Sequence, residues 1–501
     1  MVSGDGTKRA APISRSAGHL LTAAILAAPI ALASSTASAL TPLEQQWITS
    51  LQQLGKNVFF DSKASHPSHK QACASCHDPR WGWTFPDSKI NETTVVAPGA
   101  APHALGSIKP PTNAYAFFTP PFARIPGTPF PPFFIGGNFW DGRAEGCGKI
   151  DNQIYPIGDG LVSETIRRSD LPVARQFVFD RFLGPTADQA LNPFPNTVEQ
   201  NIREKNVCQV VKTAKYKKLY SDAFGEDIDC STNPKASPAY HASFTLVAVA
   251  VAAWQASPEV NSFSSKRDKG LLADPDHAFP LNQNVPAVLK IFDNDPAKLA
   301  AVNRGHDLFY RQPLPNCAGN CHNGVPSGEP ADPNGNSIHQ LYTDSRFHNI
   351  GIPFNREIPG VPKGEKVGLS RHVKGPIISP VIGPVDLSGM NKTPYLRNVD
   401  KRPTTASVKA FGHNGYFKSL WQIVHFYNTS RVKSDCATTI PNITDPTAEE
   451  AIAHDCWPRP EFPTALPPTN LVGDLKLSED EENDIVAYLE ALSDEETPKA
   501  P

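Results

Sequence analysis

The stretch that decides the fold of this chain is Cys73-Ala74-Ser75-Cys76-His77. Two cysteines separated by two residues and followed at once by histidine form the attachment pattern for c-type haem. The two thiols bond to the edge of the porphyrin, and the adjacent imidazole binds its iron from one face. The competing interpretation is half of a zinc site or a redox dithiol, but no matching cysteine pair lies nearby. The sequence therefore predicts a covalent haem on Cys73 and Cys76, with His77 as its iron ligand.

A second cluster, Cys317-Ala318-Gly319-Asn320-Cys321-His322, has one more residue between its thiols. This spacing is less specific by itself, and a haem attached there needs a small bulge in the loop. The two clusters divide the chain into an N-terminal and a C-terminal half, and we expect each half to carry one haem.

Residues 1–39 have the pattern of a secretory signal, with a basic start, an apolar stretch over 20–33 and small residues at 37–39. We expect a mature chain that begins near Leu40, has no membrane span and is exported to the periplasm, the alternative being an uncleaved anchor. The formal net charge of −3 gives no reason to expect binding to nucleic acid or to an anionic membrane surface.

Several segments have helical patterns. Thr41-Pro42-Leu43-Glu44 is a capping box with proline at the first helical position. Apolar or amphipathic patterns predict further helices over 246–254, 297–310, 419–427 and 478–492. Because 50 of the 501 residues are proline and no strong run of alternating strands occurs, we expect a mostly α-helical protein with long ordered loops, one of them within 98–135.

Further segments make the sequence similar to a known family, the bacterial di-haem cytochrome c peroxidases and MauG. Between about residues 41 and 495 they occur in the family's order. The segments are Leu54–Asp61, Phe139–Ala144, Arg304–Phe309 before the second cluster, Arg346–Gly351 and Thr393–Val399.

The resemblance implies two cytochrome c-like haem domains, at residues 40–290 and 291–495, with an insertion over 165–240 in the N-terminal one. It also implies that Cys317 and Cys321 attach the second haem and that His322 binds its iron. In the family, the N-terminal haem is the peroxide site, and the C-terminal haem stores or relays an electron.

The family's second ligand to the C-terminal haem is methionine or tyrosine, in the helix that follows a turn matched here by His413-Asn414-Gly415. The equivalent position is Tyr427, and the only methionine beyond Met1 is Met390. A tyrosine oxygen stabilises ferric iron and lowers its potential, so Tyr427 makes the chain resemble MauG more than the methionine-ligated peroxidases. The alternative is a tyrosine that packs against the haem without binding it.

Three more positions have family roles in peroxide chemistry. Trp140 sits where the family places a tryptophan between the haems that relays an electron hole; its alternative role is a core aromatic. Gln153 and Glu164 match the positions that handle protons during heterolysis of peroxide, which requires a group that takes a proton from one oxygen and returns it to the other. Asp159 is the alternative to Glu164, which could equally be an exposed glutamate.

Other ligands of the haem region follow from the same resemblance. His103 is the nearest candidate for the removable histidine that caps the peroxide haem in some members, although MauG-like members leave that position open. Arg143 and Arg397 are candidate partners of the haem propionates, because guanidinium groups favour carboxylates. The family also binds calcium between its haems, but its asparagine is not evident at Lys109-Pro110-Pro111-Thr112, which leaves calcium binding open.

Five cysteines remain outside the two clusters. We expect disulfides between Cys208 and Cys230 and between Cys436 and Cys456, because each pair encloses a loop of about 20 residues. Cys147 is left without a partner.

These observations predict an exported enzyme that reduces hydrogen peroxide to water at the N-terminal haem. Its electrons would arrive through the C-terminal haem from a small exported donor such as a cytochrome c or a cupredoxin. The first alternative is a MauG-like oxidase that uses peroxide to oxidise a protein or peptide side chain. The second is an electron-transfer cytochrome without peroxide chemistry, which would keep both axial positions of each iron filled.

Overall fold

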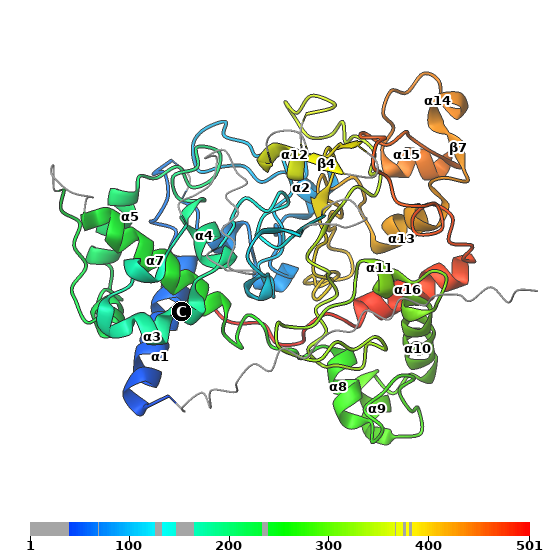
Figure 1. Cartoon of the computed structure of the whole chain (residues 1–501). Coiled ribbons are helices and arrows are strands. Elements are labelled where there is room, and N and C mark those ends of the chain that lie inside the picture. Colours follow the sequence, from blue (N-terminus) through cyan, green and yellow to red (C-terminus); the bar gives the residue numbers. More distant parts are fainter. Residues whose placement is uncertain are drawn as a thin grey trace, which may run out of the picture. The chain divides into compact units, whose positions relative to one another are not determined.

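The structure, a computed structural model, describes residues 40–68, 70–125, 133–146, 165–232, 239–365, 367–373, 377–379 and 383–501. Within this part of the chain helices dominate, and the strands form only two-stranded pairs (Figure 1). The α-helices are α1 (Pro42–Phe60), α2 (Ser88–Glu92), α3 (Gln176–Phe179), α4 (Pro185–Leu191), α5 (Glu204–Thr213), α6 (Lys218–Phe224), α7 (Ala239–Gln255), α8 (Lys266–Ala273), α9 (Pro286–Ile291), α10 (Pro296–Tyr310), α11 (Cys317–Asn320), α12 (Leu369–His372), α13 (Leu420–Thr429), α14 (Cys436–Thr439), α15 (Ala448–Ala453) and α16 (Glu479–Glu490). The short 3₁₀ turns are η1 (Cys73–Ser75), η2 (Pro79–Trp81), η3 (Ala116–Phe118), η4 (Arg168–Asp170), η5 (Val173–Arg175) and η6 (Asp180–Phe182).

The N-terminal half is built around the contact between α1 and α7, which Figure 1 shows next to each other in blue and green. Helix α7 is apolar on every side and almost completely buried, as expected for a helix at the centre of a core. The two backbones meet at Gly55, where an added Cβ atom would lie 1.9 Å from the carbonyl oxygen of Ala250. Only glycine allows this approach. The packing of α1 on α7 therefore fixes the position of the Leu54–Asp61 segment, which leads to the first cluster.

The C-terminal half repeats this arrangement with α10 and α16. An added Cβ atom at Gly305 of α10 would lie 2.0 Å from the carbonyl oxygen of Asp484 in α16. Helix α16 begins with the predicted capping box, in which Ser478 and Glu481 satisfy each other's backbone amides. Each cysteine cluster is therefore preceded by a helix that crosses a second helix at a glycine.

A hydrophobic core surrounds α10, α13 and α16 and includes Phe309, Phe417 and Leu489. Helices α8 and α9 add Leu271 and Val288 to the same core, although their residues precede position 291. The division of the chain into domains at 290 and 291 stays a prediction.

The predicted helices are confirmed, and α7 and α13 extend beyond the stretches that the pattern indicated. The loop expectation for 98–135 is right for most of its described residues. It is wrong at two places, because 123–125 and 133–135 pair as antiparallel strands. The strands are β1 (Ala123–Ile125) with β2 (Phe133–Ile135), β3 (Phe347–His348) with β6 (Asn391–Lys392), β4 (Ile377–Ser379) with β5 (Gly383–Val385), and β7 (Ser434–Asp435) with β8 (Cys456–Trp457).

Both predicted disulfides are present, Cys208 with Cys230 and Cys436 with Cys456. Cys147 lies outside the described residues. Helices α4, α5 and α6, which fall within the expected insertion at 165–240, pack against α1 and α7. No helix in the described part of the chain has the length and apolar character needed to cross a membrane. The proposed signal at 1–39 lies outside that part.

Candidate haem sites

The first cysteine cluster forms a tight turn. The carbonyl oxygen of Cys73 accepts hydrogen bonds from the amides of Cys76 at 3.1 Å and of His77 at 3.0 Å. His77 Nδ1 donates to the carbonyl oxygen of Trp83 at 3.1 Å, so Nε2 carries the lone pair of the neutral ring. Burial lowers the pKa of His77 to about 4 and raises the pKa values of Cys73 and Cys76 to about 12. A neutral imidazole held through Nδ1 is the form in which histidine binds iron.

The second cluster repeats this geometry with a wider turn. The carbonyl oxygen of Cys317 accepts from the amides of Cys321 at 3.4 Å and of His322 at 3.1 Å. The histidine amide thus reaches back five residues instead of four, which accommodates the extra residue. His322 Nδ1 donates to the carbonyl oxygen of Tyr342 at 2.9 Å, and burial lowers the pKa of His322. Two clusters of different length therefore present their histidines in the same way.

A histidine, His348, lies beside the second cluster. The side chains of Cys321, Asp344 and His348 offer ligand atoms within 4.8 Å of one another. Burial alone would lower the pKa of His348, but its hydrogen bond to Asp344 and the neighbouring thiol raise it to about 10. Through this contact the Arg346–Gly351 segment lies next to Cys321 of the second cluster. If Cys321 attached a haem, its sulfur would form a thioether and would no longer compete as a ligand to another metal.

A cavity opens beside the first cluster and encloses about 1400 Å³ of space, its open mouth included. Its wall combines the attachment residues with apolar side chains and buried amides. The residues used below are Phe59, Cys73, Cys76, His77, Trp140, Arg143, Gln189, Glu199, Gln200 and Gln255.

The residues of this cavity fit a haem. Two thiols and an imidazole with an available Nε2 converge on it, and this set of donors is the one that a c-type haem requires. The side-chain amide of Gln200 is buried, and neither its nitrogen nor its oxygen has a protein partner. The side-chain oxygen Oε1 of Gln255 lacks a protein partner as well. Such groups are costly to bury and indicate that this wall is built to face a polar ligand or water.

Trp140 lies on the wall of this cavity and also on that of a second one, described below. Its indole Nε1 donates to the carbonyl oxygen of Lys109 at 2.7 Å. Its ring lies edge-on to that of His413, with 6.4 Å between the ring centres. The hydrogen bond fixes the orientation of the ring, and the relay role of Trp140 stays a prediction.

Tyr427 projects from α13 toward the second cluster. The thiols of Cys321 and Cys317 are close enough to influence its phenol, although burial is the main reason that the pKa of Tyr427 is raised. The structure thus brings Tyr427 to the residues of the expected C-terminal haem, over a separation of more than a hundred positions. Its ligation of iron stays a prediction.

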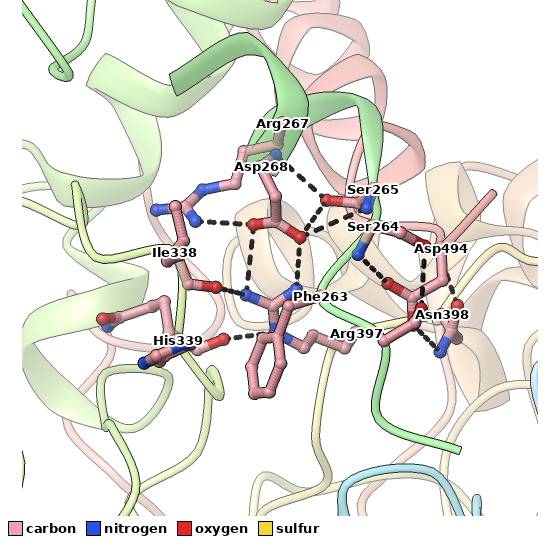
Figure 2. Close-up of polar contacts among 12 residues, drawn as sticks. Phe263, Ser264, Ser265, Arg267, Asp268, Ile338, His339, Arg397, Asn398 and Asp494 are labelled. Atoms are coloured by element: carbon pink, nitrogen blue, oxygen red, sulfur yellow. Dashed lines mark hydrogen bonds and ion pairs between the residues drawn. The ribbon is translucent and has the colours of Figure 1, made fainter. Parts of the chain in front are cut away.

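The two predicted propionate partners differ in their surroundings. Arg143 lines the cavity of the first cluster and donates through Nη1 to Asp141 at 3.0 and 2.9 Å. Figure 2 shows Arg397 facing Asp268, to which it donates at 2.7 and 3.2 Å. It also donates to the carbonyl oxygens of Gln340 and Ile338. Most of its N–H groups are therefore already paired with protein, and its role toward a propionate stays a prediction.

Some predicted residues are not placed at the cavity. Gln153, Asp159 and Glu164 lie outside the described residues. His103 is exposed on a turn at the surface and is not among the described residues that line the cavity.

Two acidic residues that no sequence pattern singled out lie at or next to this cavity. Burial raises the pKa of Glu199, which lines the cavity and accepts from Asn196 at 2.6 Å. Asp188 in α4 is fully buried and accepts from the amides of Gly146 at 2.7 Å and Ile166 at 2.9 Å. It therefore holds both ends of the segment that contains the predicted Gln153 and Glu164. No local sequence motif predicts either role, because each depends on contacts with residues that are distant in the sequence.

Comparisons with known proteins agree with this geometry. The sequence model of the family described as di-haem cytochrome c peroxidase matches residues 49–275. Methylamine utilization protein MauG of Paracoccus denitrificans is 25% identical over 476 residues, covering 93% of this chain and 94% of MauG. The crystal structure of the diheme peroxidase BthA from Burkholderia thailandensis has a TM-score of 0.57 at 22% identity, covering 90% of this chain and 88% of BthA. A tyrosine-to-methionine variant of BthA gives a TM-score of 0.60 with the same identity and coverage.

The fold of the solved diheme peroxidases and the sequence similarity extend over both halves, each with its own cysteine cluster. This chain is similar in sequence to the di-haem cytochrome c peroxidase and MauG family of haem-containing oxidoreductases.

Proposed function

We propose that this chain reduces hydrogen peroxide to water at an N-terminal haem held by Cys73, Cys76 and His77. Electrons would reach it through a C-terminal haem held by Cys317, Cys321 and His322, from a small exported cytochrome c or cupredoxin. The observation that carries this proposal is the repeated histidine geometry. In both clusters Nδ1 is bonded to a backbone carbonyl and Nε2 is left to bind iron.

The residues of the first cavity have distinct tasks in this proposal. The two thiols would hold the cofactor through thioether bonds, each formed by addition of S–H across a vinyl group of the porphyrin. When bound, the haem supplies the redox-active iron at which the O–O bond of peroxide is broken. The turn from Cys73 to His77 places the imidazole beside the two thiols, so His77 would bind the iron through Nε2.

Proton transfer to and from peroxide would require a titratable group close to the bound peroxide. Gln153 and Glu164 are proposed for this task from their family positions. Glu199 is a further candidate because its carboxyl group lines the cavity and burial raises its pKa, which favours a group that both holds and releases a proton. Substituting Glu199 and Glu164 singly by glutamine separates them, since only the residue that transfers the proton alters the pH profile of the reaction with peroxide.

Trp140 is proposed to carry an oxidising equivalent between the two halves. Its indole is held by the Lys109 carbonyl at one cavity wall and reaches the wall of the next. An oxidisable ring fixed in one orientation suits such a relay, because reorganisation of the ring is small.

The second candidate function is a MauG-like oxidation of a protein or peptide side chain, which would then supply the electrons. The position of Tyr427 next to Cys317 and Cys321 favours it, since an oxygen ligand stabilises the higher oxidation states of iron. The similarity to MauG over 93% of the chain adds support.

One experiment distinguishes these functions. Peroxide is added to the purified protein with and without reduced cytochrome c or cupredoxin, and the haem spectrum and the donor are followed by stopped flow. Rapid donor oxidation supports the peroxidase. A long-lived oxidised spectrum that decays only with a protein substrate supports the MauG-like oxidase. No spectral change on adding peroxide contradicts both and leaves an electron-transfer cytochrome.

Cofactor attachment and export have their own tests. Intact-mass spectrometry should show two haem masses on the chain, and a single haem would exclude the relay. N-terminal sequencing of the protein from the periplasm should begin near Leu40, whereas an intact leader would contradict cleavage.

A further inference from the structure

A second cavity of about 790 Å³, its open side included, lies next to Trp140. Its wall carries the basic side chains of Lys109, Lys392, Lys409 and Arg397 and includes no aspartate or glutamate among the described residues. We call it the lysine cavity. Ammonium groups removed from water need counter-charges. Asp268 pairs with Arg397, and Asp141 and Asp400 act on Lys392 and Lys409 from outside this wall, whereas burial is the one influence on Lys109.

The three lysines differ in how far the protein satisfies them. Lys409 Nζ donates to the carbonyl oxygens of three residues, Trp81 at 3.0 Å, Asn398 at 3.2 Å and Lys401 at 3.0 Å. Its three N–H groups are thereby used, and the side chain ties residue 81 to residues 398 and 401. Lys409 is therefore a structural side chain at the edge of the cavity.

The ammonium groups of Lys109 and Lys392 make fewer hydrogen bonds with the protein. Lys109 is buried, and its ammonium has one long contact of 3.4 Å, to the carbonyl oxygen of Pro110. Lys392 donates to the carbonyl oxygen of Gly137 at 2.8 Å and to Asn138 Oδ1 at 3.0 Å. Burial lowers the pKa of Lys109 to about 8 and that of Lys392 to about 7. An anionic group in the cavity would favour the charged form of both lysines and accept from the N–H groups that remain.

We propose that the lysine cavity receives the carboxylates of the haem propionates on Lys109 and Lys392, and that these ammonium groups replace the calcium ion which the family holds between its haems. The inference rests on the proposed haem binding. Carboxylate is the ligand class that matches two buried ammonium groups, through short charge-assisted hydrogen bonds.

The chemistry of the wall does not fit calcium. Calcium takes six to eight oxygen ligands, usually with carboxylates among them. Here Gly137 and Asn138 already accept hydrogen bonds from Lys392, so their oxygens face an ammonium group. A divalent cation would also be repelled by the neighbouring lysines. Lys109 is the first residue of the stretch 109–112, in which the family's calcium-binding asparagine is not evident.

Calcium content gives the first test. The purified holoprotein is dialysed against EGTA, its calcium is measured by elemental analysis, and calcium chloride is titrated back by calorimetry. We expect no stoichiometric calcium before or after dialysis and an unchanged haem spectrum throughout. One tightly bound calcium per chain would overturn the proposal.

Charge-removing variants give the second test. Lys109→Met and Lys392→Met should keep both haems but lower the reduction potential of a haem in spectroelectrochemical titration, because loss of a nearby positive charge disfavours the added electron. Lys392→Arg, which keeps the charge, and Lys476→Met at an exposed lysine should leave the potential unchanged. Unchanged potentials in both methionine variants would overturn the proposal and leave the lysines as structural groups.

A third measurement identifies the source of the carboxylate. Calorimetric titration of the holoprotein with acetate should show no saturable site, since the propionates already occupy the cavity. Saturable binding of acetate that Lys392→Met abolishes would overturn the propionate assignment. None of these measurements uses peroxide. Their results can therefore be interpreted even if the proposed peroxidase activity is not found.

Discussion

The substitution Asp268→Asn should destabilise the protein strongly, because Asp268 compensates two buried arginines. Its carboxylate accepts from Arg397 at 2.7 and 3.2 Å, from Arg267 at 2.8 Å and from Ser265 Oγ at 2.7 Å (Figure 2). All three charged side chains are at most 1% exposed. Asparagine keeps the shape but removes the charge, so two guanidinium groups remain buried without a counter-ion.

The magnitude follows from the cost of breaking a buried ion pair. Removal of one partner costs about 3–5 kcal/mol, and Asp268 serves two arginines, so we expect a loss at or above that range. Such a loss is a large part of the roughly 5–15 kcal/mol that stabilises a typical domain. Urea unfolding of the holoprotein, followed by tryptophan fluorescence and the haem band, measures it. The matched control is Asp222→Asn in the exposed pair with Lys218, which should cost no more than about 0.5 kcal/mol.

The same site predicts a dependence on acid. Burial would raise the pKa of Asp268, but Arg397 and Arg267 outweigh it and hold that pKa at about 2. An unfolded aspartate has a pKa of about 3.9. The folded value is depressed, so this stabilisation is present above about pH 4 and is lost as the pH falls toward 2. Asp268→Asn should lack that part of the acid sensitivity.

Loss of the Asp268 charge should also affect the C-terminal haem. Arg397 donates to the carbonyl oxygens of Ile338 and Gln340, close to Tyr342, whose carbonyl holds His322. Loosening of this segment should broaden or shift the spectrum of the C-terminal haem. A stability loss under about 1 kcal/mol, equal to that of the control, together with an unchanged spectrum, would refute the argument.

The remaining predictions concern single side chains around the haem sites. Tyr427→Phe should alter the spectrum of the C-terminal haem and raise its potential, because ferric iron loses an oxygen donor, whereas Tyr416→Phe, whose hydroxyl donates to the Pro446 carbonyl, should change neither; identical spectra for both variants would reject ligation by Tyr427. Trp140→Phe should retain both haems and react normally with peroxide in stopped flow, but should slow oxidation of the electron donor, since phenylalanine is much harder to oxidise; wild-type rates in both steps would make Trp140 a core aromatic. Burial raises the pKa of Asp188 to about 7, above its unfolded value of about 3.9, so its contribution to stability is greatest below about pH 4 and is lost as the pH rises through 7. Asp188→Asn should flatten the unfolding free energy between pH 4 and 7, and an unaltered pH profile would contradict this assignment.

Features encoded over a few residues were predictable from the sequence. The five residues from Cys73 to His77 have the spacing that the porphyrin edge requires, and a single turn provides it. The capping box at Ser478 fixes the start of α16 through hydrogen bonds within four residues. The disulfide between Cys208 and Cys230 closes a loop short enough to be inferred from spacing. Each of these three features depends on geometry between residues close in the sequence, so the sequence is sufficient to predict it.

The partners of individual charged groups were decided only by the tertiary structure. Arg397 was expected to face a propionate, yet its guanidinium is largely occupied by Asp268, 129 positions away. Glu199 and Asp188 gave no local signal, because their character comes from burial and from contacts with distant segments. The lysine cavity brings Lys109 and Lys392 to one wall from opposite halves of the chain. Residue order specifies helical periods and turn chemistry, whereas the desolvation and pairing of a charge depend on which distant elements pack around it.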